Sequence, residues 1–251
     1  MSLSDTDVER YSRQLILDGV GEAGQARLGA ARVLVVGAGA LGSPVVQYLA
    51  ASGVGHLTIY DGDLVELSNL SRQPLHGEAD VGTSKAESAA TAARSINSAV
   101  DVVAVAQRLS PIESEGVVGG FDVVCDATDD FTIKFALNDA CVSAGVPLVH
   151  AAILEYGGQL TTVMPGGPCY RCLFGGEPDP AAVPTCAQAG ILGPVASVVG
   201  GLQATEALKV ILGVGQPLSG RLLVYDGLRP HIRVVEFARD PGCSARHNPA
   251  L

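Results

Sequence analysis

The stretch ARVLVVGAGALGSP, residues 31–44, decides how this chain folds. A run of apolar and β-branched residues leads into Gly37, Gly39 and Gly42, which stand at G-x-G-x-x-G spacing. After a buried strand, the first glycine permits a tight turn and the second lets the backbone approach a phosphate. The third lets the following helix pack close to the sheet, with its N-terminus facing the anion. The loop therefore predicts a bound nucleotide, but it does not distinguish NAD from ATP.

The residues around this loop alternate between strand-like and helix-like patterns. Such alternation is typical of a mainly parallel sheet with helices on both faces. We therefore expect an α/β, Rossmann-like fold in the first 150 residues or so. The expected strands are 32–37, 56–61, 100–109, 121–128 and 147–153, and the expected helices are 41–53, 84–97 and 133–145.

The rest of the chain is expected to complete a single domain over residues 1–251. Strand-like segments after Gly157 predict antiparallel C-terminal additions to the sheet. One long, largely buried helix is expected between them. The expected strands are 158–165, 220–227 and 231–239, the helix is 193–213, and the remaining parts are a helical N-terminal segment (1–30), an exposed, mobile Pro/Gly-rich loop (174–190) and a C-terminal tail (240–251).

Composition excludes several classes of function. The chain of 251 residues is 47% apolar and 17% charged, which suits a large core. Its net charge of -10 argues against a nucleic-acid binder, because phosphate contacts need a clustered positive field. No uninterrupted apolar run predicts a membrane span, and the polar N-terminus lacks the apolar region of a secretory signal. We therefore expect a cytoplasmic protein whose six cysteines are reduced.

Polar residues downstream of the glycine loop favour ATP over NAD. Asp61 stands 19 residues after Gly42, where a carboxylate can bind ribose hydroxyls. A dehydrogenase has little use for the cations and amides that come next, whereas a triphosphate under attack needs fixed cations to stabilise its charge. Taken singly, each cation would be an ordinary surface charge; their joint spacing is what favours ATP. These residues are Asn69, Arg72, Gln73 and Lys85.

A third candidate element is CDATDD, residues 125–130, at the carboxyl end of a predicted buried strand. Ligands of open α/β sheets lie at such ends. Asp129 can hold magnesium there, since this ion prefers oxygen ligands together with substrate phosphates. The alternative is that Asp129 or Asp130 caps the following helix.

The cysteines and histidines leave more than one interpretation open. Cys169 and Cys172 stand at C-x-x-C spacing, which is half of a tetrahedral zinc site or else a redox pair. Cys125 and Cys141 lie in apolar surroundings and are expected in the core. No Ser–His–Asp set is present, and most histidines are expected to be structural or to lie at the surface. Those histidines are His56, His76, His150 and His231.

In their order along the chain, these motifs resemble the ThiF/MoeB/HesA family, the bacterial relatives of ubiquitin-activating enzymes. The resemblance extends from about residue 9 to residue 243. The motifs are RYSRQLIL (10–17), VVGAGALGSP (35–44), LSNLSRQ (67–73), Lys85, DATDD (126–130), CYRC (169–172), TCAQAG (185–190), GGLQATEALK (200–209) and PGC (241–243).

The resemblance implies an adenylyltransferase that uses magnesium ATP. Its substrate would be the C-terminal glycine of a small ubiquitin-fold sulfur carrier ending in Gly-Gly, and the adenylate would go on to a thiocarboxylate. Arg13 would reach across a homodimer interface into the neighbouring site, like an arginine finger. The remaining implied roles are backbone contacts from Gly39 and Ala40, ribose binding by Asp61, phosphate contacts from Asn69, Arg72 and Lys85 with Gln73 beside them, and the ATP–magnesium site at Asp129 and Asp130.

The family pattern also bears on two cysteine sites. Members complete the zinc site with a second C-x-x-C, but here Cys243 is followed by Arg246 at the expected fourth position and then by His247. A Cys₃His site formed by Cys169, Cys172, Cys243 and His247 is one outcome, and a lost or weakened site is the other. Cys186 matches a cysteine that some members link covalently to the carrier.

Two other functions remain as alternatives at this stage. One is a nucleotide-binding relative without activity, and the other is an NAD-dependent oxidoreductase. The sequence includes no sulfurtransferase domain, so the sulfur donor is expected to be a separate protein, such as a cysteine desulfurase or sulfurtransferase. The residues do not choose between the thiamine, molybdopterin and related pathways.

Overall fold

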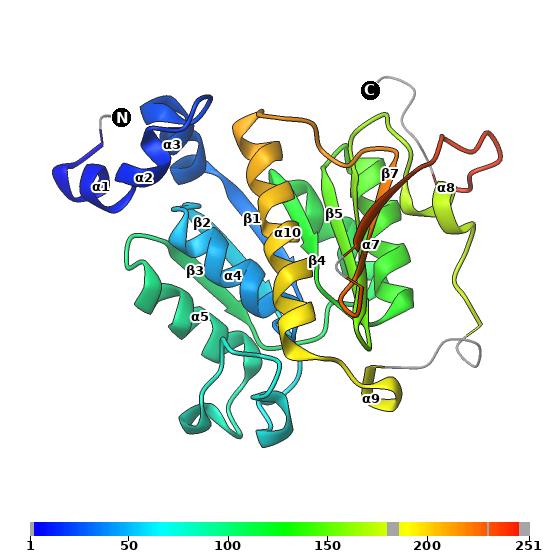
Figure 1. Ribbon diagram of the computed structural model, residues 1–251, viewed down its shortest axis with the longest axis horizontal. Coiled ribbons are helices and arrows are strands. Elements are labelled where there is room, and N and C mark those ends of the chain that lie inside the picture. The colour runs from blue at the N-terminus through cyan, green and yellow to red at the C-terminus, as the bar shows by residue number, and fades with distance from the viewer. Residues whose placement is uncertain (1–2, 180–185, 230, 246–251) are drawn as a thin grey trace.

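The computed structural model describes residues 3–179, 186–229 and 231–245. One eight-stranded sheet runs through the molecule in the order β3-β2-β1-β4-β5-β6-β7-β8 (Figure 1). The first five strands pair in parallel, and the last three are antiparallel additions. The strands are β1 (Arg32–Val36), β2 (His56–Tyr60), β3 (Asp101–Val105), β4 (Val123–Asp126), β5 (Leu148–Leu154), β6 (Gly157–Val163), β7 (Arg221–Asp226) and β8 (His231–Glu236).

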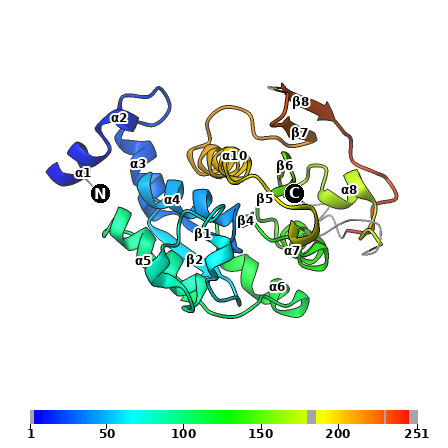
Figure 2. The same ribbon diagram turned by 60° about the horizontal axis from the view of Figure 1, so that its bottom comes forward.

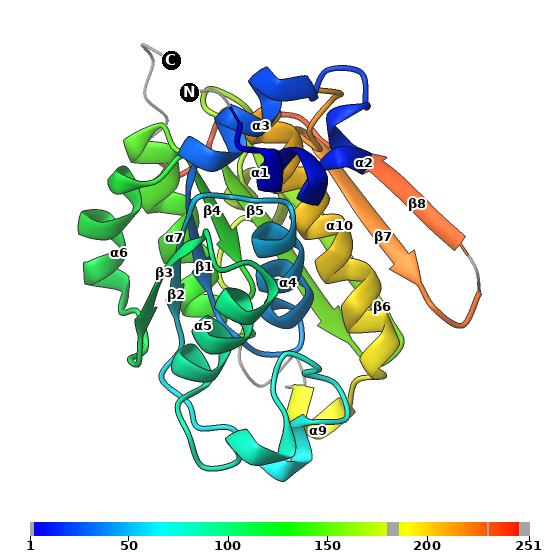
Figure 3. The same ribbon diagram turned by 90° about the vertical axis from the view of Figure 1, so that its left-hand side faces the viewer.

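Helices cover both faces of the sheet, as Figures 2 and 3 show. Helices α4, α5 and α10 lie on one face, and α6 and α7 lie on the other; α1 to α3 stand at one end. The helices are α1 (Asp5–Arg10), α2 (Ser12–Leu15), α3 (Gly21–Ala30), α4 (Gly42–Ala51), α5 (Lys85–Ile96), α6 (Pro111–Val117), α7 (Phe131–Ala144), α8 (Tyr170–Phe174), α9 (Cys186–Ala189) and α10 (Gly193–Leu212).

The α/β class, the eight strands and the antiparallel C-terminal part are as the sequence predicts. Several strands are shorter than expected: β3 ends at Val105, β4 begins at Val123 and β8 ends at Glu236. The N-terminal segment forms three helices, α6 and α8 are additional, and part of the predicted loop 174–190 is the short helix α9. Residues 180–185 of that loop and most of the predicted C-terminal tail lie outside the described residues.

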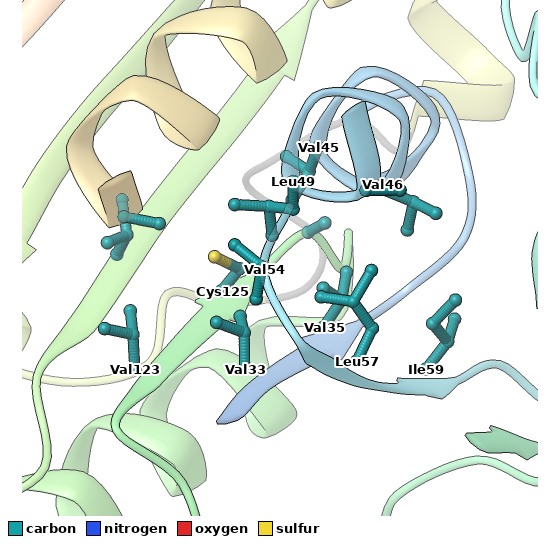
Figure 4. Packing of buried hydrophobic residues seen from close by; sticks show 14 of the residues in the cluster. Val33, Val35, Val45, Val46, Leu49, Val54, Leu57, Ile59, Val123 and Cys125 are labelled. Carbon is teal, nitrogen blue, oxygen red and sulfur yellow. The ribbon is translucent and has the colours of Figure 1, made fainter. Parts of the chain in front are cut away.

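Period-two alternation along the strands builds a core on each face of the sheet. Val33 and Val35 of β1 point toward α4, together with neighbours from β2 and β4 (Figure 4). Leu34 and Val36 belong to the core on the opposite face, beneath α7. Since burying one such side chain contributes about 1.5–3 kcal/mol, the β-branched run that precedes the glycine loop anchors the centre of the fold.

Helix α10 is long and apolar enough to cross a membrane, judged by length and composition alone. In this structure it packs against β4, β5, β6 and α4 (Figure 1). Its buried amide and carboxylate hydrogen-bond to the sheet: Gln203 Nε2 donates to the Asp126 carbonyl at 2.8 Å, and Glu206 accepts from Thr162 Oγ1 at 2.7 Å. These contacts are those of a helix built into a protein core.

Substitutions at two adjacent glycines of α10 test this packing. A Cβ on Gly200 would lie 2.4 Å from Pro44 Cγ and 2.7 Å from the Leu41 carbonyl oxygen, whereas a Cβ on Gly201 would meet nothing within 4 Å. We expect Gly200→Ala to lower the free energy of unfolding by roughly 2–3 kcal/mol through overpacking. Gly201→Ala should raise it by about 0.5–1 kcal/mol, because alanine is the better helix former.

Urea unfolding followed by circular dichroism measures both changes. Equal shifts of the same sign in the two variants would contradict the close contact between α10 and the start of α4.

Candidate active site

Three loops meet at the carboxyl ends of the parallel strands. They are the glycine loop between β1 and α4, the crossover segment between β2 and α5, and the loop between β4 and α7. The strand order reverses between β1 and β4, and open α/β sheets bind ligands at such a switch point. In Figures 1 and 3 this end of the sheet lies at the bottom of the view, together with the crossover segment and the short helix α9.

Two of the three predicted glycines are required by the turn itself. Gly37 has a φ of 99°, and a Cβ there would lie 2.7 Å from the Ala127 carbonyl oxygen. A Cβ on Gly42 would lie 2.0 Å from the Gly37 carbonyl oxygen. A Cβ on Gly39 would meet only Gln73 Nε2, at an ordinary 3.7 Å. Nothing described in the chain fills the space at Gly39, as expected where a ligand approaches the backbone.

Asp61 lies at the end of β2 and is held by backbone donors on both oxygens. Its Oδ2 accepts from the Ala38 N–H of the glycine loop, and its Oδ1 accepts from the Asp63 N–H, both at 2.8 Å. Each carboxylate oxygen keeps a second lone pair, which remains suited to a hydroxyl donor. The carboxylate is thus fixed beside the glycine loop, where the sequence places a ribose.

The crossover segment brings the predicted amides to the same loop. A single turn, Leu67–Asn69, buries Asn69, whose Oδ1 accepts from the Glu66 N–H at 3.1 Å. Gln73 is 5% exposed, and its Oε1 has no hydrogen-bond partner among the residues that the structure describes. An unpaired buried amide oxygen costs about 1–3 kcal/mol, and phosphate oxygens only accept, so the missing donor to Gln73 Oε1 would have to be a hydroxyl or N–H group.

The two predicted phosphate-binding cations differ in their surroundings. Arg72 is half-buried, and its Nη1 donates to the Ser68 carbonyl at 2.8 Å. Lys85 is the first residue of α5 and is 8% exposed, with its Nζ 3.2 Å from Asp63 Oδ2. Asp63 also accepts from Arg108 Nη2 at 2.8 Å. Partial burial raises the pKa of Asp63, but hydrogen bonds from Arg108 and Lys85 outweigh it and hold that pKa below its ordinary value.

The acidic loop after β4 supplies the third side of the site. Asp129 is exposed there, where a magnesium–phosphate complex can reach it. Asp130 caps α7, since its Oδ1 accepts from the Ile133 N–H at 3.2 Å. The capping role left open by the sequence therefore falls to Asp130, and its contact with the nucleotide stays a prediction.

Sequence reasoning missed a buried charge network directly beneath this loop. Asp126 is fully buried, with its Oδ2 2.9 Å from Lys134 Nζ and 2.7 Å from His150 Nδ1. Burial alone would raise the pKa of Asp126, but the Lys134 charge and the His150 hydrogen bond lower it to about 2. The network ties β4, β5 and α7 together under the Asp129 loop. Its partners come from three elements, so no local pattern reveals them.

Two other residues lie in the site although the sequence did not assign them to it: Asp63 was not considered, and His76 was expected to be structural or at the surface. His76 is buried between the crossover segment and the glycine loop, and Asp63 pairs with Lys85. The D-x-D spacing of Asp61 and Asp63 was a usable signal. His76 gave none, because its partners lie on other segments.

Three cysteines converge away from the glycine loop. The Cys169 sulfur lies 3.7 Å from that of Cys172 and 3.6 Å from that of Cys243. Tetrahedral zinc with bonds near 2.3 Å places its sulfur ligands about 3.8 Å apart, so the described thiols fit three of four positions. Cys169 and Cys172 are thus joined by Cys243, as the resemblance implies. His247 lies outside the described residues, and the fourth ligand stays a prediction.

The remaining cysteines and the N-terminal arginine are placed apart from this cluster. Cys125 and Cys141 are fully buried, as expected, and burial raises the pKa of the Cys125 thiol to about 12. Cys186 begins the short helix α9, and its side chain is not described. Arg13 is exposed on α2, at the opposite end of the molecule from the glycine loop (Figure 3). The structure does not bring Arg13 to the site of its own chain.

Known proteins resemble this chain in sequence. It is 51% identical over 243 residues to "SAMP-activating enzyme E1" of Haloferax volcanii, covering 97% of this chain and 90% of that protein. It is 46% identical over 249 residues to "Sulfur carrier protein adenylyltransferase" of Thermus thermophilus, covering 97% and 92%. The mouse "Adenylyltransferase and sulfurtransferase MOCS3" is 50% identical over 244 residues, but the match spans only 53% of that longer protein.

The fold has solved counterparts as well. A crystal structure of E. coli MccB with ATP aligns with a TM-score of 0.83 and 26% identity, covering 95% of this chain and 75% of that one. The profile of the family described as "ThiF family" matches residues 11–245, which is nearly the whole chain. On this match and on identities near 50%, the chain belongs to the ThiF family.

Proposed function

We propose that this chain adenylates the C-terminal glycine of a ubiquitin-like sulfur carrier, using ATP and releasing pyrophosphate. The observation that carries the proposal is the gathering of a cationic, amide-rich crossover segment around a glycine loop that is open at Gly39. Relatives named as an adenylyltransferase of a sulfur carrier and as a SAMP-activating enzyme support it.

The residues present fit magnesium ATP. Gly39 leaves room for a phosphate beside the backbone. Asp61 would hold the ribose, and Asn69, Arg72 and Lys85 would hold the phosphates. Magnesium, when bound at Asp129, would neutralise phosphate charge and orient the leaving pyrophosphate.

The reaction follows from these placements. The terminal carboxylate of the carrier attacks the α-phosphorus, the bond from that phosphorus to the bridging oxygen breaks, and pyrophosphate leaves with the bonding electrons. The attacking carboxylate is already ionised, so no general base is needed. Arg72 and Lys85 act by position and charge, stabilising the negative charge that gathers on the phosphates. Lys85 would exchange its contact with Asp63 for the phosphates, while Arg108 keeps the Asp63 charge paired.

Further features belong to the same proposal. Arg13 would complete the site of a second copy, which makes the working unit a homodimer. Zinc would be held by Cys169, Cys172 and Cys243 with His247, and Cys186 would be a thiol for covalent linkage to the carrier. The sulfur donor would be a separate protein. A cytoplasmic location agrees with the cysteines whose side chains are described, because none of them forms a disulfide.

The two alternatives account for fewer observations. An NAD-dependent oxidoreductase uses the glycine loop and Asp61 but leaves Arg72, Gln73 and Lys85 without a role. An inactive relative would have no need of a buried Lys85 whose charge is paired with the Asp63 carboxylate.

ATP–pyrophosphate exchange tests the proposal directly. We expect incorporation of labelled pyrophosphate into ATP only when a carrier with a free Gly-Gly end is present. A carrier that lacks its last glycine serves as the matched control. If folded protein that binds ATP shows no exchange with any candidate carrier, the proposed adenylyltransferase activity is refuted.

Lys85→Met and Arg72→Ala test the phosphate cluster. Each is expected to lower kcat/KM for ATP in the exchange reaction by about 100-fold or more, since fixed charges at the reacting phosphate contribute on that scale. Arg32→Ala is the matched control, because it removes an exposed cation at the opposite end of β1. Activities of Lys85→Met and Arg72→Ala equal to that of Arg32→Ala would refute the assignment.

Metal analysis tests the cysteine cluster. We expect about one zinc per chain, lost in Cys172→Ser together with several degrees of the unfolding temperature, because metal binding is coupled to folding. Cys141→Ser, in the core of the same α7 face, should keep its zinc. If the wild-type protein contains no zinc, and if Cys172→Ser melts at the same temperature as the wild type, the zinc site has been lost.

A further inference from the structure

Ala38 of the glycine loop is held on both sides of its backbone. Its N–H donates to Asp61 Oδ2 at 2.8 Å, and its carbonyl accepts from His76 Nε2 at 2.9 Å. Ala38 is fully buried, so neither polar group can turn to solvent instead. The orientation of the peptide between Ala38 and Gly39 is therefore fixed by Asp61 and His76.

This clamp has a consequence for the next two N–H groups. In a trans peptide the carbonyl and the N–H point to opposite sides, so a carbonyl that is held inward by His76 turns the Gly39 N–H away from it. The Gly39 carbonyl accepts from Ser43 N at 2.9 Å and from Ser43 Oγ at 2.8 Å, which turns the Ala40 N–H in the same way. Within the described residues, neither N–H has an acceptor. Two adjacent N–H donors in the loop just before α4 form an anion-binding concavity.

The other edge of the His76 ring reaches α5. His76 Nδ1 lies 2.8 Å from Ser88 Oγ, and Ser88 follows Lys85 by about one turn. The Ala38 carbonyl can only accept, so Nε2 carries the ring proton and Nδ1 accepts from the Ser88 hydroxyl. Burial lowers the pKa of His76, which agrees with this neutral ring.

His76 also belongs to the segment that carries the phosphate-binding residues. Its own N–H donates to the Gln73 carbonyl at 3.1 Å. One buried ring thus joins the glycine loop, the crossover segment with Gln73, and α5 with Lys85. These are three of the elements on which a polyphosphate would rest.

We propose that His76 is a positioning residue for nucleotide binding, which acts through the Ala38–Gly39 peptide and itself touches no phosphate. The inference rests on the proposed function in that the ligand is taken to be ATP. The Nε2 donor of His76 orients the Gly39 N–H toward the phosphates. The burial of the His76 ring fixes the distance between that N–H and the crossover segment.

Two variants of similar shape separate this role from simple packing. In His76→Gln the amide Nε2 can replace the imidazole donor to the Ala38 carbonyl, whereas His76→Met has similar length without a donor. Calorimetric titration with ATP and magnesium, without any carrier, gives the dissociation constant of each. We expect about tenfold weaker binding in His76→Met and a change within about threefold in His76→Gln, the scale of one hydrogen bond.

The exchange reaction provides the second readout. The KM for ATP should rise in His76→Met by the same factor as the dissociation constant, while the KM for the carrier stays unchanged. Ser88→Ala is the matched control, because it removes the partner of Nδ1 and leaves the Ala38 contact. Thermal unfolding of all variants measures the packing cost separately. If His76→Met fails to fold, His76→Asn replaces it, since its shorter amide loses the Ala38 contact.

Equal dissociation constants for His76→Gln and His76→Met, whether weakened or unchanged, would overturn the inference. If the wild-type protein binds ATP but catalyses no exchange, the proposed function is refuted. The ATP titrations then still decide the role of His76. A wild-type protein that binds no ATP would remove both.

Discussion

The site depends on one close approach of backbone to backbone. The chain leaves β1 at Gly37 and turns beneath the loop that follows β4. It then enters α4 at Gly42, which packs against the Gly37 carbonyl. A Cβ at either position would lie within 2.7 Å of a carbonyl oxygen, that of Ala127 or that of Gly37. Since real Cβ contacts are never that short, only glycine allows the two loops to touch. Every other part of the site is positioned relative to this contact.

Two lysine–aspartate pairs lie near this crevice and differ in how firmly each is held. Lys134 and Asp126 are at most 3% exposed, and breaking such a buried pair costs about 3–5 kcal/mol. Asp63 is 45% exposed on the side chain, and it has Arg108 as a second partner when Lys85 turns to another anion. The first pair is therefore a fixed part of the fold. The second is an exchangeable contact, which suits a cation that must meet an incoming phosphate.

The sequence predicted the sheet well because the information for it is local. A β-branched run, a glycine turn and an alanine-rich helix each carry their own pattern, and Asp61 is found by its distance from the glycine loop. The residues that were missed depend on contacts between distant segments. His76 meets Ala38 from 38 positions away, and His150 meets Asp126 from 24. No periodicity encodes such pairs, and a lone histidine in a sequence is rightly expected to be structural.

Helix α7 connects the acidic loop to the cysteine cluster along one face. Asp130 caps its first turn, Lys134 reaches back to Asp126, and Asn138 accepts the Tyr170 N–H at 2.8 Å. These residues are four apart, the spacing that places side chains on the same side of a helix. Tyr170 stands between Cys169 and Cys172, so the C-x-x-C turn is docked on the same rigid helix that supports the Asp129 loop. A metal at the cysteines would thus stabilise the base of the site without touching the nucleotide, which is the role of a structural ion.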